Sequence, residues 1–338
     1  MYCPKCGSQI LAGEKSCNKC GEVITTLTEN NSNQKPKLNF GGTLSKAFKY
    51  PWKNKTLWFF GIIIAIFAAG SSGGGGGNDN LTSEQSLSAL NRLKDFFQTP
   101  GAIVLIVIMI LLVIILAILS LVAKNWALSA TIKGALQIES KEKVTIKKLS
   151  KTGFKPVWRL IILNFFIPVA FILTLTVVFI LGGFIFFFIP QPAGLIIGII
   201  LAIILIIALI PFLVYLYIIW SMACRFIVAK DQETIQSIKL ARQLIKNNFW
   251  ITFAYSFVSR AIMGFGSCMG SIIFIIFLIL LIVSIFSGNT IAIIILGLLT
   301  LVTLLFYLIV AGYFCAFNET GITIWWNDLK RLKESDKK

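Results

Sequence analysis

The stretch Gly101–Ala123 reads GAIVLIVIMILLVIILAILSLVA and carries no charged residue. A helix needs about 20 predominantly apolar residues to cross the hydrocarbon core of a bilayer. This stretch therefore predicts a transmembrane helix. The whole chain has the same character, because 57% of its 338 residues are hydrophobic and only 13% are charged, against about 25% charged residues in soluble domains. We expect an all-α polytopic membrane protein.

Further apolar segments of similar kind predict six transmembrane helices in all. The first is the shortest, because LWFFGIIIAIFAAG holds only 14 residues before SSGGGGGNDN. A segment of that length predicts a helix that begins earlier in the chain or that is tilted or partly interfacial. The six predicted spans cover residues 57–72, 101–123, 157–183, 194–224, 264–287 and 290–317.

The positions of the basic residues predict the topology. The formal net charge is +17, and 28 of the 31 Lys and Arg residues fall in segments 1–57, 124–159, 225–250 and 319–338. Basic residues accumulate in the cytoplasmic loops of membrane proteins. We therefore expect a cytoplasmic (plasma) membrane protein with both its N- and C-termini in the cytoplasm. The basic charge would attract anionic lipid headgroups, which makes membrane lipids the expected partners and nucleic acid an unlikely one.

Three segments share a plan and predict an internal repeat. Each has a basic amphipathic run, then a Trp, then the start of an apolar pair. This pattern predicts three units, each with an elbow helix on the cytoplasmic surface followed by a hairpin of two transmembrane helices. The alternative is that basic residues and an interfacial Trp precede any helix that starts at the cytoplasmic side. The segments are SKAFKYPWKNKTLWFFGIII (45–64), IKKLSKTGFKPVWRLIILNF (146–165) and IKLARQLIKNNFWITFAYSF (238–257).

The N-terminus, MYCPKCGSQILAGEKSCNKCGEV, has the cysteine spacing of a metal site. Cys3 and Cys6 form one Cys-x-x-Cys pair, and Cys17 and Cys20 form the other. Four thiolates make a closed tetrahedral set, which suits one structural zinc ion and leaves no open position for catalysis. Iron is an alternative metal. Disulfides are disfavoured because the predicted location is reducing.

These residues carry a resemblance to a known module. CPKCGSQILAGEKSCNKCGEVI resembles the short zinc ribbon found at the N-terminus of many prokaryotic membrane proteins. The resemblance implies that the four cysteines bind one zinc ion within a small β-hairpin. So short a module has no core of its own, and the metal would supply its folding energy.

The membrane part carries a looser resemblance. FIVAKDQETIQSIKLARQLIKNNFWITF (226–253) is similar to segments of the membrane domains attached to glycerophosphodiester phosphodiesterases and of related families. That resemblance implies a fold more than a function, because the catalytic domain of the family is not present in this chain. The predicted organisation is a zinc ribbon at 1–24, a flexible linker at 25–42, a membrane domain at 43–319 and a charged cytoplasmic tail at 320–338.

Polar residues within or beside the apolar segments are the candidate functional residues. Arg225 and Glu319 lie at the cytoplasmic ends of the fourth and sixth predicted spans, where they could pair, and Lys124 ends the second in a similar place. Asn164 lies in the third span. Arg260 follows Trp250 by ten residues, and we expect it at the interface, with the fifth span starting near Gly264. The alternative is a straight spanning helix from Trp250, which would carry Arg260 about 15 Å deep and would require a partner for its charge. The alternative for the paired charges is ordinary boundary charge.

Enzyme chemistry is not expected. The chain has no His, and its apolar regions hold no paired carboxylates, so the common general bases are missing. We expect a non-catalytic membrane protein whose zinc ribbon recruits a cytoplasmic protein partner or regulates the membrane domain. The alternative is a transporter or lipid-handling protein with a polar cavity lined by Arg225, Arg260, Glu319 and Asn164. A third reading is a ribbon that binds nucleic acid beside the membrane.

Overall fold

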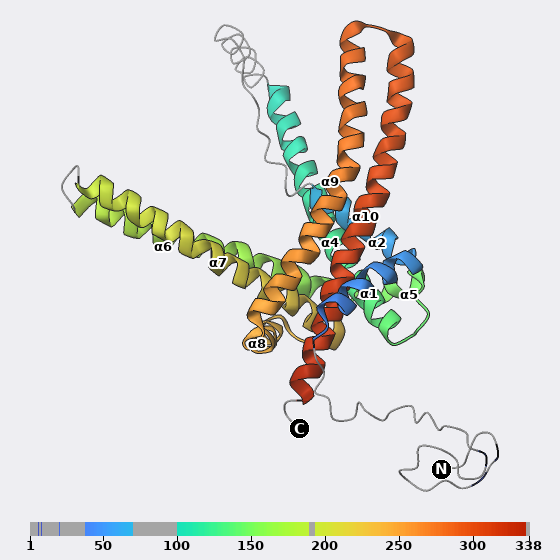
Figure 1. The fold of residues 1–338 in the computed structure, drawn as a ribbon. Helices are drawn as coiled ribbons and strands as arrows, with labels where there is room; N and C mark the ends of the chain where they lie inside the picture. The colour runs from blue at the N-terminus through green and yellow to red at the C-terminus, as the bar shows by residue number, and fades with distance from the viewer. Residues whose placement is uncertain are drawn as a thin grey trace. The chain divides into compact units, whose positions relative to one another are not determined.

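The structure, a computed structural model, describes residues 38–69, 100–188 and 193–335, together with Cys6, Ser8 and Cys20. These described residues form α-helices and no strand. The β-hairpin predicted for residues 1–24 and most of the predicted linker lie outside them. The helices, labelled as in Figure 1, are α1 (Phe40–Lys53), α2 (Thr56–Ala69), α4 (Pro100–Glu139), α5 (Ile146–Phe154), α6 (Val157–Phe188), α7 (Ala193–Lys230), α8 (Thr234–Ile245), α9 (Phe249–Ser287) and α10 (Thr290–Ser335).

Five described helices are long and apolar enough to cross a membrane: α4, α6, α7, α9 and α10. α2 is apolar but has only 14 residues, which gives it a length of about 21 Å, less than the roughly 30 Å of a bilayer's hydrocarbon core. The predicted first span, 57–72, runs on into residues that the structure does not describe. The described helices therefore supply five of the six predicted spans and a short apolar helix in the place of the first.

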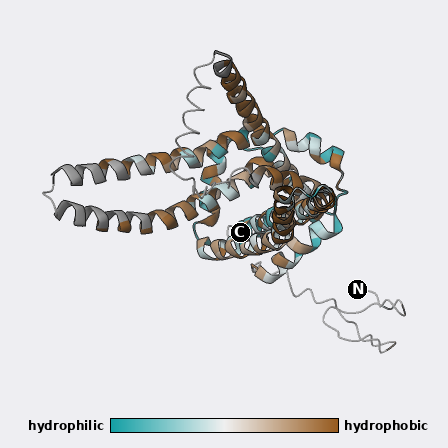
Figure 2. Cartoon of the chain, turned by 90° about the horizontal axis from the view of Figure 1, so that it is seen from above, coloured by the Kyte–Doolittle hydropathy of each residue, from teal (hydrophilic) through white to brown (hydrophobic). Residues whose placement is uncertain are grey.

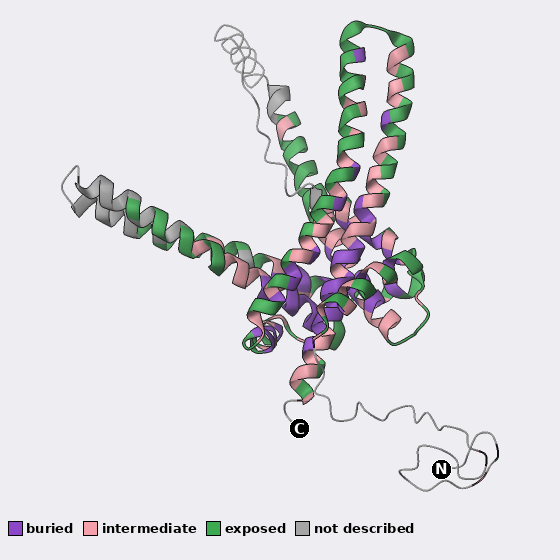
Figure 3. Ribbon diagram, viewed as in Figure 1, coloured by how far each residue is buried: buried purple, intermediate pink, exposed green. Residues whose placement is uncertain are grey.

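The long helices have two zones. In α4 the large apolar side chains from Val104 to Leu119 are exposed, whereas buried residues gather from Asn125 to Ala135. α10 repeats this division, with exposed side chains from Ile291 to Ile309 and buried ones from Ala311 to Trp326. Figure 3 shows the change from exposed to buried along these helices, and Figure 2 shows how apolar the exposed zones are. An exposed apolar zone fits lipid, and the buried zone forms the protein core.

Three short helices cover the buried zone. α1, α5 and α8 precede α2, α6 and α9, and each turns a face with buried residues toward the core. Residues four apart lie on one face of a helix. A small or apolar side chain at every fourth position therefore gives each short helix one face that packs on the core. The buried residues on this spacing are Thr43, Ala47 and Pro51 in α1, Leu149 and Gly153 in α5, and Ser237, Ala241 and Ile245 in α8.

The helices α2 and α4, α6 and α7, and α9 and α10 follow one another in pairs. Each short helix packs on the second helix of one pair. α5 packs on α4, where a Cβ atom on Gly153 would lie 3.1 Å from Ala130. α8 packs on α7. α1 packs on α10, where the rings of Phe48 and Phe317 stack with centroids 4.2 Å apart. The last long helix thus contacts the first short one. The placement of the short helices on a membrane surface remains a prediction.

Several predicted boundaries differ from the helix ends. The boundary between membrane domain and tail, at 319/320, falls inside α10, which continues to Ser335. Trp325 and Trp326 are buried in this continuation. α4 and α7 also run past their predicted ends, to Glu139 and Lys230. The charges that marked the ends of the apolar runs do not stop these helices, because tertiary packing extends them beyond the lipid-like zone.

Candidate functional site

A cavity of about 290 Å³ lies among five helices of the buried zone. Its walls come from α2, α4, α7, α9 and α10, and three of its lining residues are charged. The residues that line it are Ile64, Lys124, Leu128, Tyr217, Trp220, Arg260, Met263, Cys315, Asn318 and Glu319.

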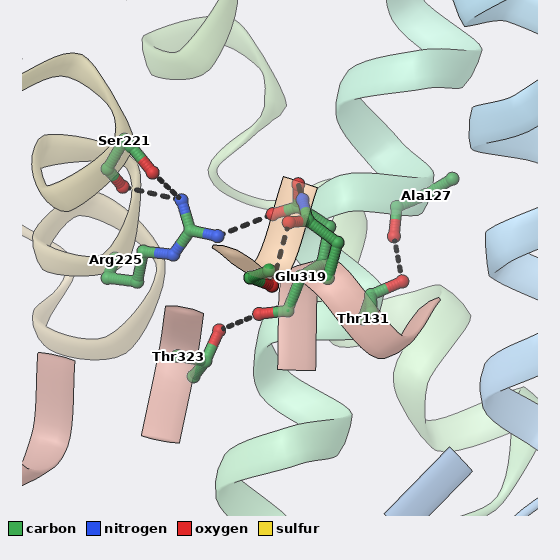
Figure 4. A network of polar contacts seen from close by, with 8 residues as sticks. Ala127, Thr131, Ser221, Arg225, Glu319 and Thr323 are labelled. Carbon is green, nitrogen blue, oxygen red and sulfur yellow. Dashed lines mark hydrogen bonds and ion pairs between the residues drawn. The ribbon is translucent and has the colours of Figure 1, made fainter. Parts of the chain in front are cut away.

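The carboxylate of Glu319 is held by an ion pair with Arg225. Arg225 on α7 donates from Nη2 to Oε2 of Glu319 on α10 at 2.5 Å, and the two side chains are only 1% and 15% exposed. Its other terminal nitrogen donates to the carbonyl and hydroxyl oxygens of Ser221, one turn earlier on α7 (Figure 4). Arg225 therefore lies behind the cavity wall and fixes the position of the acid that faces the cavity.

A second contact orients the other oxygen of Glu319. Asn318 donates from Nδ2 to Oε1 of Glu319 at 3.2 Å, and Ser259 on α9 donates to Oδ1 of Asn318 at 3.0 Å. These hydrogen bonds connect α9 to α10 at the level of the Arg225–Glu319 pair. Both carboxylate oxygens of Glu319 thus accept hydrogen bonds, one from Arg225 and one from Asn318.

Arg260 faces the cavity without an ion-pair partner among the described residues, although the negative charge of Glu319 on the same cavity wall acts on it from a greater distance. Its guanidinium carbon lies 3.9 Å from the centroid of the Tyr217 ring, which is a cation–π contact. No hydrogen bond or ion pair joins it to any other described residue, and its buried Nε has no partner. No helix boundary lies near Gly264, where the sequence predicts the start of the fifth span, because α9 is one continuous helix from Phe249 to Ser287. Arg260 consequently turns toward the other helices.

Lys124 supplies the second unpaired cation. It is the first charged residue after the charge-free stretch 96–123 and is partly buried on α4. Among the residues that the structure describes, no acid pairs with it. In the same way, Arg260 immediately precedes and Glu319 immediately follows the charge-free stretch 261–318. All three charges of the cavity therefore lie where long apolar runs end.

Asn164 belongs to a hydrogen-bond chain behind the wall of the cavity. It donates to Oδ1 of Asn125 on α4 at 2.8 Å, and it accepts from Nε1 of Trp220 on α7 at 3.0 Å. Asn125 in turn donates to the carbonyl oxygen of Leu121. The chain ties α4, α6 and α7 together and fixes the indole of Trp220, which lines the cavity.

The structure thus brings the four predicted polar residues close to one cavity in different roles. Arg260 and Glu319 line it, whereas Arg225 and Asn164 hold residues that line it. Sequence reasoning missed Tyr217, Trp220 and Asn125. Their signal is weak, because an aromatic or an Asn near the end of an apolar run is typical of any membrane boundary.

A separate charged cluster joins the loops near α5, α6 and α8. Asp231 accepts from Lys155 at 3.0 Å and from Arg159 at 2.6 Å. The hydrogen bond from Lys155, with a further contribution from Arg159, lowers the pKa of the Asp231 carboxyl below its usual value. Asp231 has a φ of 54°, a left-handed conformation that Asp tolerates better than most residues. The cluster fixes the turn between α7 and α8.

The predicted zinc ligands are only partly described. Cys6 and Cys20 are among the described residues, whereas Cys3 and Cys17 lie outside them. The fit to zinc therefore rests on the donor set, since four thiolates are what a structural zinc ion takes. If zinc is bound, Cys3, Cys6, Cys17 and Cys20 would hold it.

Comparisons with known proteins agree with this donor set and add a family. Residues 2–24 match the zinc-ribbon domain. No curated protein and no solved structure matches the chain, and the comparisons give no support for a resemblance to the glycerophosphodiester phosphodiesterase membrane domain. Residues 78–316, which carry Lys124 and Arg260 and make up more than half of the chain, match a domain of unknown function, DUF8558. The chain belongs to the DUF8558 family.

Proposed function

We propose that this chain is a non-catalytic integral membrane protein of the cytoplasmic membrane that binds a ligand in its helical domain. Ligand binding of this kind serves transport or lipid handling. The observation that carries the proposal is the cavity of about 290 Å³ with charged side chains from three helices. Charged groups inside membrane domains are costly, and they mark ligand or ion sites when they face a cavity.

The chemistry of the cavity favours binding over catalysis. Glu319, the acid that faces the cavity, is held by Arg225 and Asn318, so it is poorly placed to act as a general base. The chain has no His to take that role. Apart from Glu319, the charged groups of the cavity are cations, and aromatic rings line it as well. Such groups bind charged ligands, and they do not by themselves catalyse a reaction.

The topology follows the basic residues. Both termini and the basic segments at 124–159 and 225–250 would face the cytoplasm, with six helices crossing the membrane and α1, α5 and α8 as elbows on its inner surface. The five long apolar helices support this arrangement, as does the packing of α5 on α4, of α8 on α7 and of α1 on α10. The cavity would then lie toward the cytoplasmic side.

The zinc ribbon would recruit a cytoplasmic protein partner or regulate the helical domain. Its match over residues 2–24 and its closed set of four thiolates support a structural zinc ion rather than a catalytic one. A polar segment at 25–39 joins it to α1, which begins at Phe40, inside the predicted linker of 25–42, and so polar a linker suits tethering. A protein that only scaffolds through its ribbon is the second candidate function.

Native mass spectrometry of the full-length protein in detergent tests the proposal. We expect one zinc ion per chain and a retained molecule of defined mass. The Arg260→Gln protein should lose that molecule and keep its zinc. A chain that keeps one zinc but never retains a ligand would favour the scaffold function instead.

A further inference from the structure

The cavity carries more positive than negative charge. Arg225 and Glu319 neutralise each other through their ion pair. Lys124 and Arg260 both line the cavity, and neither is paired with an acid among the described residues. Two positive charges are therefore left without a counter-ion in a partly buried space. Such charges are costly unless a partner compensates them, so the missing component is an anion.

The geometry of Arg260 suits an oxyanion. Its guanidinium stacks over Tyr217, and stacking holds the planar group in one orientation while it leaves its outer edge able to donate. A guanidinium presents paired N–H groups that match two oxygens of a phosphate, and a Lys ammonium adds a point charge. Arg260 and Lys124 reach the cavity from α9 and α4, so an anion between them would be clamped by two elements.

The level of the cavity along the helices points to the source of the anion. Lys124, Arg260 and Glu319 each stand at the end of a charge-free run, at 96–123 or 261–318. The hydrocarbon of a bilayer ends where such runs end, and lipid phosphates lie just beyond. The exposed apolar zone of α4 ends within a few residues of this level, at Leu119, whereas α9 has exposed apolar side chains on both sides of Arg260, at Phe257 and Phe265.

The size of the cavity limits what it holds. Its volume of about 290 Å³ lies just below the range of roughly 300–1,000 Å³ for ligand pockets. This space accommodates a headgroup but not the acyl chains of a lipid. Ile64, Leu128 and Met263 make part of the wall apolar.

We propose that this cavity binds a phosphate group, with the Arg260 guanidinium and the Lys124 ammonium as its ligands. The inference rests on the proposed function and names the ligand class. Arg225 and Asn164 act as positioning residues, because they hold Glu319 and Trp220 and do not themselves line the cavity. The phosphate comes from one of two sources, an anionic phospholipid headgroup or a free phosphate ion.

The unfolding temperature of the full-length protein tests the proposal. A ligand that binds only the folded state raises this temperature, by an amount that grows with the logarithm of its concentration once this exceeds its Kd. The probes are phosphatidylglycerol, inorganic phosphate and, as a zwitterionic comparison, phosphatidylcholine, each titrated into protein in a neutral detergent. A saturable shift with phosphatidylglycerol that exceeds the shift with phosphatidylcholine identifies the lipid source. A saturable shift with inorganic phosphate identifies the free ion.

The variants decide whether the cavity is the site. Arg260→Gln and Lys124→Gln should each lower the affinity for the probe that shifts the unfolding temperature by about tenfold or more. The loss of a hydrogen bond to a charged group has an effect of this size. Arg260→Lys should keep part of the affinity, because a lysine keeps the positive charge but lacks the paired N–H groups of the guanidinium. The matched controls are Arg242→Gln and Lys147→Gln, at exposed positions on α8 and α5, which should leave the shift unchanged.

Two results would overturn the inference. In the first, Arg242→Gln weakens binding as much as Arg260→Gln, which would mean general attraction to a basic surface. In the second, neither phosphatidylglycerol nor inorganic phosphate shifts the unfolding temperature, although native mass spectrometry shows a retained neutral molecule. The second result rejects the phosphate and leaves the proposed function intact, whereas a protein that retains nothing and responds to no probe rejects both.

Discussion

Arg225 is the most deeply buried charge among the described residues, at 1% exposed, and its contact with Glu319 links α7 to α10. The folded state depends on both partners, because removal of one leaves the other charge buried without compensation. The strength of the pair therefore shows most clearly when one partner is removed.

We predict that Glu319→Ala destabilises the helical domain by about 3–5 kcal/mol, the usual cost of an uncompensated buried charge. Glu142→Ala is the matched control, because it removes an ion pair with Lys148 whose side chains are 53% and 49% exposed. That change should cost less than about 1 kcal/mol. Thermal unfolding of the purified variants measures both, and equal costs would contradict the structural role of the buried pair.

The sequence allowed the charged residues of the site to be found but not their contacts. Arg225, Arg260 and Glu319 stand out because charged residues within membrane-spanning segments are rare, although charges at the ends of such segments are common. The ring under Arg260 belongs to Tyr217, 43 positions earlier in the chain, and no local pattern predicts a contact of that separation. The distinction between Arg225, which holds Glu319, and Arg260, which faces the cavity, likewise depends on tertiary packing.

Among the elements, α2 and α10 approach each other most closely at two glycines. A Cβ atom on Gly61 would lie 2.0 Å from the carbonyl oxygen of Gly312, and a Cβ atom on Gly312 would lie 2.8 Å from the backbone nitrogen of Ile62. Backbone atoms cannot move aside as the end of a side chain can. Small residues at helix crossings permit this kind of close packing in membrane proteins.

We predict that Gly61→Ala separates α2 from α10 and lowers the stability by about 1–3 kcal/mol, the usual cost of overpacking. Gly264→Ala is the matched control, because a Cβ atom at this helical position meets nothing within 4 Å. That control should be neutral or stabilising by up to about 1 kcal/mol, because Ala favours a helix more than Gly does. If both variants unfold at the same temperature, the close crossing is wrong.

The turn between α7 and α8 depends on pH through Asp231. Its hydrogen bond from Lys155 holds the pKa of the folded carboxyl below its usual value, which is about 3.9 in unfolded chains. A lowered folded pKa means that the contribution is fully present above the unfolded value and is lost as the pH falls through the folded pKa. Because the side chains are well exposed, the contribution stays below about 1 kcal/mol.

We predict that Asp231→Asn lowers the unfolding temperature slightly at pH 7 and that this difference disappears below about pH 4. The comparison is a mutant cycle. One arm is Asp231→Asn, and the other arm carries Lys155→Gln and Arg159→Gln together. In that background Asp231→Asn should have no further effect. A full effect of Asp231→Asn without the two basic partners would show that the ion pairs do not hold the turn.

Helix ends were the least predictable feature of the elements. The predicted second span ends at residue 123, yet α4 runs to Glu139, which makes it about 60 Å long, twice the thickness of the hydrocarbon core. The apolar run reports only the part of a helix that matches lipid. Beyond it, residues such as Ala127 and Ala130 are buried against other helices, and this packing extends the helix.

For the molecule as a whole, the zinc ribbon and the helical domain should fold independently. The ribbon would depend on metal because 24 residues build no core, whereas the helical unit from Phe40 to Asn327 has its own buried core. We predict that Cys6→Ser abolishes zinc binding and unfolds residues 1–24 but leaves the unfolding of the helical domain unchanged. Metal analysis and thermal unfolding measure the two parts, and normal zinc stoichiometry in Cys6→Ser would contradict the ligand set.

Deletion of residues 1–39 tests the proposed role of the ribbon. The shortened protein should keep its ligand-dependent rise in unfolding temperature, because every residue that lines the cavity lies between Ile64 and Glu319. It should lose any cytoplasmic protein that co-purifies with the full chain. If the deletion alters neither the co-purifying proteins nor the helical domain, the ribbon does not act as a tether or regulator.

The central claim is that the helical domain holds an anion in a cavity at the cytoplasmic boundary of the membrane. The most direct measurement is a structure of the full-length protein in nanodiscs that contain phosphatidylglycerol. The predicted result is a phosphate group within hydrogen-bond distance of Arg260 and Lys124, with the lipid hydrocarbon ending at their level. A cavity that lies at the bilayer centre, or one that holds no anion beside these two residues, would contradict the claim.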